Sequence, residues 1–172
     1  MSNEITKVIG EIELNNETLV ITDPCYLLHK GNGDEIKEIN GKVFNDPWIA
    51  CGYGYKFNVF GVEKFVTSTT LYGDWSCTVF DQKNTKKTYG EFCADAGLVT
   101  IIPLYEVLKF NPTWLDWHKD HEWCSSLIPD FNGKVRIVNG YKEYPNNEEE
   151  RYEECWIEGY GNINFISGQT GF

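Results

Sequence analysis

The sequence is poor in basic residues, in alanine and methionine, and in long apolar runs. Fifteen Lys and Arg residues stand against twenty-six Asp and Glu residues, so the formal net charge is −11. A field of that sign repels phosphate backbones and anionic membranes, which argues against non-specific nucleic-acid binding. No apolar run approaches the roughly 18 residues of a membrane span, and the N-terminal segment lacks the basic start and apolar block of a signal peptide. We therefore expect a cytoplasmic protein that does not bind membranes.

Motifs of common enzymes and metal sites are also missing. The chain has no phosphate-binding GxxxxGK[ST], no GxSxG and no HExxH segment. Its six cysteines never form the Cys-x-x-Cys pair of zinc ribbons and thioredoxin-like sites. Reduced and mostly buried thiols are the simplest interpretation. We predict no cofactor and no catalytic residue.

Aromatic residues are abundant, with 10 Tyr, 10 Phe and 6 Trp among 172 residues. Together with the shortage of alanine and methionine, this favours pleated, half-buried surfaces over helices. Residues 1–172 are expected to form a single domain. We predict a mostly β fold, either a β-sandwich or a strongly curved antiparallel meander sheet, with one α-helix at about 112–125, so that the chain is α+β by count.

Alternating apolar and polar residues predict the strands. Segments 8–14 and 18–22 read as a hairpin turned by Asn15 and Asn16, and segments 64–72 and 75–81 read as a second hairpin turned by Gly73 and Asp74. Segment 88–93 should follow 75–81 through a polar turn. The nearly continuous apolar segment 97–103 is expected to be the central strand, buried on both faces. Further strands are predicted over 134–138, 152–159 and 162–166.

The predicted helix begins at Asn111 and Pro112, a capping residue followed by proline at the first helical position, and it should end before Pro129. Its residues Trp114, Trp117, His118, His121 and Cys124 recur every three or four positions, as in a stripe packed on a sheet. His118, His121 and Cys124 are metal ligands by type. They spread over roughly 120° of helix surface, wider than the pair that converges on one ion. The stripe explains them as core, so we predict no metal.

Three aspartates stand where strands begin or end. Asp23, Asp74 and Asp95 lie beside Pro24, Gly73 and Gly97, and three loop carboxylates that gather at one rim could hold a divalent cation or catalyse hydrolysis. Aspartate is also common in turns and caps, which explains the same positions without a site.

Cys25 follows Asp23 and Pro24 on the loop that ends segment 18–22. Loops of this kind often carry catalytic groups, and a thiolate needs a neighbouring base to become a nucleophile. No base is close in sequence, so a structural thiol beside a turn proline is the preferred interpretation.

The segment NNEEERYEE at 146–154 is the densest run of charge. A solvated loop and a charged strand edge explain it. Its functional alternative is an acidic docking surface for a basic groove of a partner protein, of the kind that normally holds nucleic acid.

Four segments resemble those of a group of small proteins from bacteriophages and some bacteria. They are VITDPCYLL, STTLYGDWSCTVFD, GEFCADAGLVTIIP and ISGQTGF. The group carries a DPCY-like loop, a YGDG-x-Y-x-V hairpin, a DAG strand and a terminal QTG, and Trp75 stands here where the group usually has glycine. The resemblance implies a phage or mobile-element setting, and small acidic phage proteins without enzyme motifs resemble inhibitors of host defence, including anti-CRISPR proteins.

We therefore predict a non-enzymatic phage or mobile-element protein that blocks a host protein, including a nucleic-acid-binding one, with an acidic and aromatic face. One alternative is a binder that sequesters a nucleotide signal in a pocket. Another is a metal-dependent hydrolase. The residues predicted to contact a ligand or partner are Asp23, Cys25, Tyr26, Asp74, Trp75, Asp95, Gln169, Glu148, Glu149, Glu150, Glu153 and Glu154.

Overall fold

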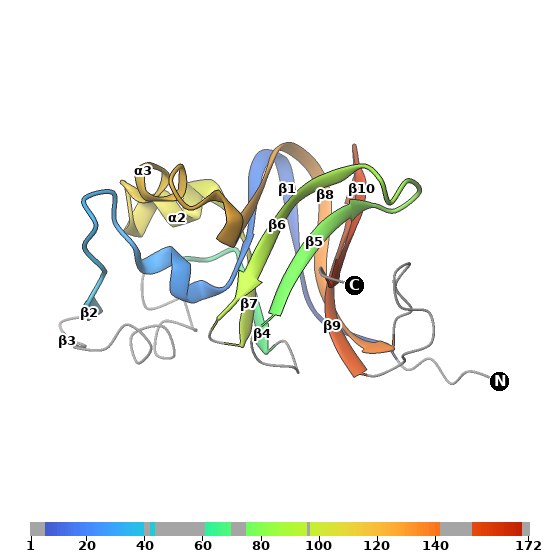
Figure 1. Ribbon diagram of the computed structural model, residues 1–172, viewed down its shortest axis with the longest axis horizontal. Helices are drawn as coiled ribbons and strands as arrows, with labels where there is room; N and C mark the ends of the chain where they lie inside the picture. Colours follow the sequence, from blue (N-terminus) through green and yellow to red (C-terminus); the bar gives the residue numbers. More distant parts are fainter. Residues whose placement is uncertain are drawn as a thin grey trace.

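The computed structural model describes residues 6–39, 42–43, 61–69, 75–95, 97–141 and 153–169. Most of them belong to one eight-stranded sheet with the order β4-β7-β1-β8-β9-β10-β5-β6. Every neighbouring pair is antiparallel. The sheet curls into a half-barrel (Figure 1), which confirms the mostly β class and the curved antiparallel sheet, and selects it over a sandwich. Its strands are β1 (Lys7–Thr22), β4 (Val66–Thr69), β5 (Trp75–Asp81), β6 (Thr88–Ala94), β7 (Leu98–Pro103), β8 (Ser125–Tyr141), β9 (Glu153–Gly161) and β10 (Asn164–Gln169).

The first predicted hairpin is wrong, because residues 7–22 form one continuous strand. Both halves of β1 pair with β8, from Lys7 opposite Asn139 to Thr22 opposite Ser125. Asn16 has a φ of 55° and marks a bulge rather than a turn, and Asp130 of β8 has a φ of 53° near the same point. Asparagine and aspartate tolerate this left-handed conformation. The two long strands therefore bend together at the top of the half-barrel (Figure 1).

Side chains and close backbone contacts hold this bend against β9. Asn162 accepts a hydrogen bond from the Asn132 amide at 2.9 Å and donates to the Asp130 carbonyl at 2.8 Å. Gly133 lies opposite Gly161, and a Cβ at Gly133 would stand 2.2 Å from the carbonyl oxygen of Tyr160. Only glycine fits there, since the φ of Gly133 is also 156°.

The second predicted hairpin is also wrong, because β4 and β5 lie near opposite ends of the sheet. β4 pairs with β7, whereas β5 pairs with β6 and β10. The predicted turn from segment 75–81 into 88–93 is confirmed as the β5–β6 hairpin, where Asp81 accepts the amides of Lys83 and Asn84. Strand β7 is buried as predicted, but it lies second from the sheet edge rather than at the centre.

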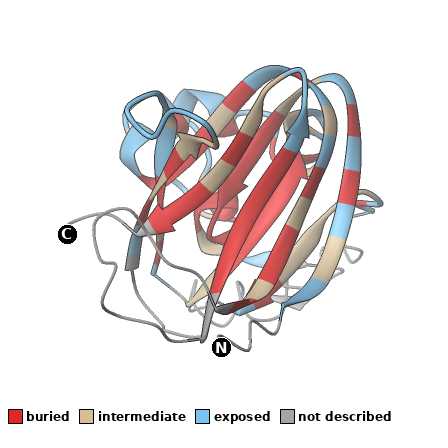
Figure 2. Cartoon of the chain, turned by 90° about the vertical axis from the view of Figure 1, so that its right-hand side faces the viewer, coloured by how far each residue is buried: buried red, intermediate tan, exposed pale blue. Residues whose placement is uncertain are grey.

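The core has two parts on opposite faces of the sheet. Leu19, Ile21 and Ile101 point into the half-barrel with the larger cluster, which also holds Phe131 and Phe165. On the other face, Val20 and Ile102 pack against Leu27, Val107 and Trp114 beneath the helices. Strand β7 and the last residues of β1 are thus covered on both sides, which explains why these segments are continuously apolar. Figure 2 shows buried residues along the strands.

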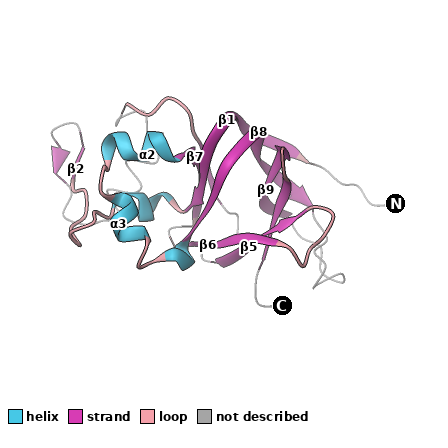
Figure 3. Cartoon of the chain, turned by 90° about the horizontal axis from the view of Figure 1, so that it is seen from above, coloured by secondary structure: helices cyan, strands magenta, loops and turns pink. Residues whose placement is uncertain are grey.

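The helical residues gather beside β7 and β1 (Figure 3). They form η1 (Pro24–Leu28), α2 (Leu104–Phe110), α3 (Trp114–His118) and η3 (Glu122–Cys124), and a two-stranded sheet joins β2 (Glu38–Ile39) to β3 (Lys42–Val43). The helix predicted over 112–125 is therefore interrupted after His118. Asn111 ends α2 instead of starting α3, which begins after Thr113, and the Asn111 side chain donates to the carbonyls of Leu27 and His29. Pro129, the predicted stop, lies within β8.

A buried carboxylate stabilises the outer face of β8 and β9. Glu158 is 8% exposed and accepts hydrogen bonds from Arg136, from Trp156 Nε1 at 2.8 Å and from the Tyr160 hydroxyl at 2.9 Å. Burial alone would raise the pKa of Glu158, but these hydrogen bonds outweigh it and lower that pKa. Glu158 and Arg136 therefore form a structural ion pair, and both carboxylate oxygens of Glu158 already accept hydrogen bonds.

Candidate functional site

Asp23 ends β1 and begins η1. Its carboxylate is fully buried, and Oδ1 accepts the Cys25 amide at 3.0 Å, as expected of a capping residue followed by proline. The other oxygen lies 3.4 Å from the Leu98 amide at the start of β7. Asp23 therefore fastens η1 to the β6–β7 connection, and its role is to position neighbouring residues.

Tyr26 connects η1 to two other parts of the fold. Its hydroxyl donates a short hydrogen bond to Asp95 Oδ2, and its carbonyl accepts from the Trp114 indole N–H at 2.9 Å. Burial, together with the hydrogen bond to Asp95, raises the pKa of Tyr26 well above its usual value. The hydroxyl therefore stays protonated at neutral pH and continues to donate to the Asp95 carboxylate.

Rings from three helical segments stack around Tyr26. Trp117 lies between two histidines, with ring centres 4.4 Å from His29 and 4.3 Å from His121 and nearly parallel planes. Trp123 meets the Tyr26 ring edge-on at 6.0 Å. These geometries are the favourable ones for aromatic pairs. We call the five residues Tyr26, His29, Trp117, His121 and Trp123 the aromatic ledge.

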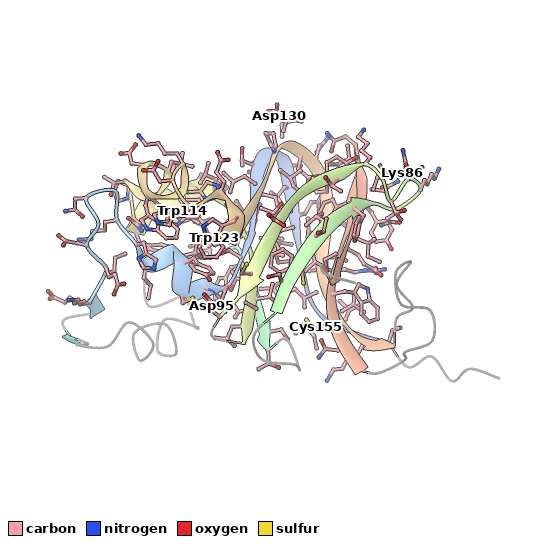
Figure 4. All side chains as sticks on the ribbon, viewed as in Figure 1. Lys86, Asp95, Trp114, Trp123, Asp130 and Cys155 are labelled. Carbon is pink, nitrogen blue, oxygen red and sulfur yellow. The ribbon has the colours of Figure 1, made fainter. Side chains whose placement is uncertain are left out.

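The ledge has one prominent exposed ring beside one exposed carboxylate. Trp123 is 51% exposed, whereas Trp114, which supports Tyr26 from below, is fully buried. Asp95 is also exposed. Figure 4 shows Trp123 and Asp95 where the helical segments meet the sheet, away from Lys86 at the tip of the β5–β6 hairpin. Tyr26 touches both residues, so it joins them into one surface.

The four sequence segments that resemble those of the phage group all have described residues at the end of the sheet where Asp95 lies. Trp75 pairs with Ala94, directly before Asp95, and Gln169 pairs with Cys77 two residues after Trp75. Tyr26 completes the row through its bond to Asp95. The structure describes only the backbone of Trp75 and Gln169, and Asp74 lies outside the described residues. The sequence segments that suggested a site are thus brought together.

The three residues of the helical region that are metal ligands by type do not form a metal site within the described residues. His121 Nδ1 donates to the Trp117 carbonyl at 2.8 Å, and the Cys124 thiol donates to the His121 carbonyl at 3.0 Å. His118 stacks on Trp114. Burial raises the pKa of Cys124 to about 12, so the thiolate that metals bind is disfavoured. Within the described residues, no group of three or more His, Cys, Asp and Glu side chains could hold a metal ion.

Other predicted residues have varied outcomes. Cys25 is half-buried in the first turn of η1, where Asp23 caps its amide. Glu148, Glu149 and Glu150 lie outside the described residues, and only the backbone of Glu153 and Glu154 is described, at the start of β9. The acidic docking surface predicted for segment 146–154 therefore stays a prediction.

Sequence reasoning missed Trp123 as a site residue. It took Trp117 and His121 as core, although their spacing of four residues does predict the observed ring stack. Trp123 lies outside the stripe formed by Trp114, Trp117 and His121. That position predicts that the Trp123 ring is exposed, and this signal was available in the sequence. His29 carried no comparable signal, because its contact with Trp117 depends on the path of η1.

Two open grooves lie elsewhere among the described residues. One, of about 430 Å³, runs between β1 and α2 and is lined in part by Glu106. That carboxylate is already bonded to the amides of Glu63 and Lys64 and to Lys109. The other, of about 370 Å³, lies in the turn after His29 and is lined by Lys30, Gly33, Asp34, Glu35 and Lys37.

The fold and site together define a curled antiparallel half-barrel with an aromatic and acidic surface at one end. No protein-family model, curated protein or solved structure matches this chain. Within the described ranges, no helix has the length and apolar character needed to cross a membrane.

Proposed function

We propose that this chain is a non-enzymatic binding protein that docks on a partner protein through the aromatic ledge and Asp95. The observation that supports this most is the exposed indole of Trp123 held beside an exposed carboxylate by the buried Tyr26. Tryptophan and tyrosine are enriched among residues that dominate interface energies, because they bury a large area with few rotatable bonds.

The rigidity of the ledge favours binding over a purely structural role. Tyr26 is held by hydrogen bonds at both its hydroxyl and its carbonyl, and Trp117 is clamped between two histidines. A surface that is already ordered loses little conformational entropy when a partner binds. Trp114 provides the core packing, so the exposed part of Trp123 is available for a partner.

A nucleotide ligand fits this surface less well than a protein. Burial lowers the pKa of His29, so its ring is neutral near pH 7 and offers no charge to a phosphate. The exposed carboxylate of Asp95, which accepts from Tyr26 of the ledge, repels an anion. Both faces of Trp117 are already covered by histidines, so a base has no access to that ring.

Hydrolysis is also less favoured, because Asp23 and Asp95, the two described members of the predicted aspartate group, have protein partners. Asp23 is buried with both oxygens near backbone amides, and Asp95 accepts from Tyr26.

We propose a phage or mobile-element setting, and inhibition of a host defence protein, on the resemblance of the four sequence segments alone.

The test is capture of a host protein from bacterial lysate by the immobilised chain and by matched variants. Trp123→Ala and Asp95→Asn should abolish capture of a partner that the parent protein retains, since a central tryptophan is worth about 2 kcal/mol or more. Tyr105→Ala removes another exposed ring, on α2, and should leave capture intact.

A second set of variants separates the ledge from the acidic run. Reversal of Glu148, Glu149, Glu150, Glu153 and Glu154 to Lys should change capture less than Trp123→Ala does. Equal capture by Trp123→Ala and the parent chain would contradict the proposal. Loss of capture only in the charge-reversed variant would move the docking surface to segment 146–154.

A further inference from the structure

The carboxylate of Asp95 is prepared for a further hydrogen bond. The Tyr26 hydroxyl donates a hydrogen bond to Oδ2 of this carboxylate. The buried phenol holds one oxygen of the carboxylate, and Asp95 itself is exposed to solvent. An exposed carboxylate in a fixed orientation is an acceptor for a cationic donor.

The indole of Trp123 supplies a second feature that suits a cation. The rings of Tyr26 and Trp123 form a T-shaped pair with planes 79° apart, and about half of Trp123 is exposed. The backbone of Trp123 is held in place by the Cys93 thiol, whose sulfur lies 3.6 Å from the Trp123 carbonyl oxygen. The face of an indole carries negative electrostatic potential and attracts guanidinium and ammonium groups.

The remaining rings of the ledge do not compete for that role. Trp117 has His29 on one face and His121 on the other. Glu35 faces His29 at 3.5 Å, so the nearest ionised neighbour of that histidine is also negative. The formal net charge of the chain is −11, and a field of that sign steers a basic partner towards it.

We propose that Asp95 and Trp123 together receive the guanidinium group of an arginine side chain presented by a basic partner protein. This inference rests on the proposed function and names the chemistry of its partner. Arginine is favoured over lysine because a planar guanidinium stacks on an indole while its N–H groups bond a carboxylate, whereas a compact ammonium offers no flat surface.

The direct test is a titration of the full chain with a capped Gly-Arg-Gly tripeptide at low ionic strength. The chemical shift of the Trp123 indole N–H resonance in NMR reports binding. The same tripeptide with citrulline keeps the shape of the side chain but removes its charge, and a lysine tripeptide keeps the charge but removes the plane. We expect the arginine tripeptide to bind about tenfold more tightly than the citrulline one. Lysine should fall between them, and added salt should weaken the arginine response.

Variants test whether the response to the arginine tripeptide depends on Asp95 and Trp123. Asp95→Asn should reduce affinity for the arginine tripeptide to that for citrulline, whereas Glu91→Gln removes an exposed carboxylate of neighbouring β6 and should have little effect. For Trp123→Ala, the amide resonance of Cys93 replaces the missing indole, and its response to arginine should vanish.

Two outcomes would overturn the inference. One is equal binding of arginine and citrulline tripeptides, and the other is an arginine response that survives both Asp95→Asn and Trp123→Ala. In either case the proposed function stands if lysate capture is still lost on Trp123→Ala. If capture is insensitive to that variant while arginine binds as expected, the proposed function fails and the cation site remains.

Discussion

Replacement of Trp114 by phenylalanine should destabilise the protein much more than the same replacement at Trp123. Trp114 is fully buried, stacks on His118 and donates to the Tyr26 carbonyl at 2.9 Å. Loss of part of the buried ring should cost about 1–2 kcal/mol in transfer and cavity terms. Loss of the hydrogen bond adds about 1 kcal/mol. The total, about 2–3 kcal/mol, corresponds to a fall in Tm of about 4–12 °C for a chain of this size.

Urea unfolding followed by far-UV circular dichroism gives the measurement. Trp114→Phe should shift the midpoint without changing the slope, as expected for a loss of native-state packing. Trp123→Phe should stay within about 0.5 kcal/mol of the parent, since half of that side chain is already in water.

Similar costs for the two replacements would refute the reasoning. They would show that the indole of Trp114 does not hold η1 in place, and that the division between a supporting tryptophan and an exposed one is wrong. Tyr26 would then not be held in place by the hydrogen bond from Trp114 to its carbonyl.

Three further predictions follow from the same contacts. Tyr26→Phe removes the donor to Asp95, so it should weaken capture of the partner severalfold while the fold persists, as measured by binding and circular dichroism. Glu158→Gln should lower the free energy of unfolding by about 1–3 kcal/mol. Because the folded pKa of Glu158 is lowered, its contribution is present above the unfolded value near 4.5 and is lost as pH falls through the folded pKa, so Glu158→Gln should flatten the acid limb of the stability profile. Gly133→Ala should destabilise the bend by more than about 2 kcal/mol in urea unfolding, whereas Asn132→Ala, at an exposed neighbouring side chain, should cost less.

Local patterns predicted the class of fold but not the partners of its strands. The apolar segment 97–103 became a strand buried on both faces, because its composition already requires cover on each side. Asn15 and Asn16 resemble a turn, since asparagine accepts positive φ, yet pairing with the distant β8 keeps β1 continuous. Which strand pairs with β4 or β5 depends on contacts far apart in sequence, which periodicity does not encode.

The site was predicted in part. Tyr26 and Asp95 were selected from their segments, and the structure joins them by a hydrogen bond between positions 69 residues apart. Asp23 proved to be a cap, as the residue type itself suggested. Trp123 was not selected, although it lies outside the stripe of Trp114, Trp117 and His121, and the structure leaves it exposed in η3. A helix continuing to residue 125 would have placed that ring differently.

The most direct test of the account is the affinity of the captured partner, by isothermal titration calorimetry, for the parent chain, Trp123→Ala and Tyr105→Ala. We predict that Trp123→Ala raises Kd by about thirtyfold or more, as for a central interface tryptophan. Tyr105→Ala, which removes an exposed ring on α2, should change Kd less than about threefold. Equal Kd values for the two variants would contradict the claim that the aromatic ledge is the binding surface.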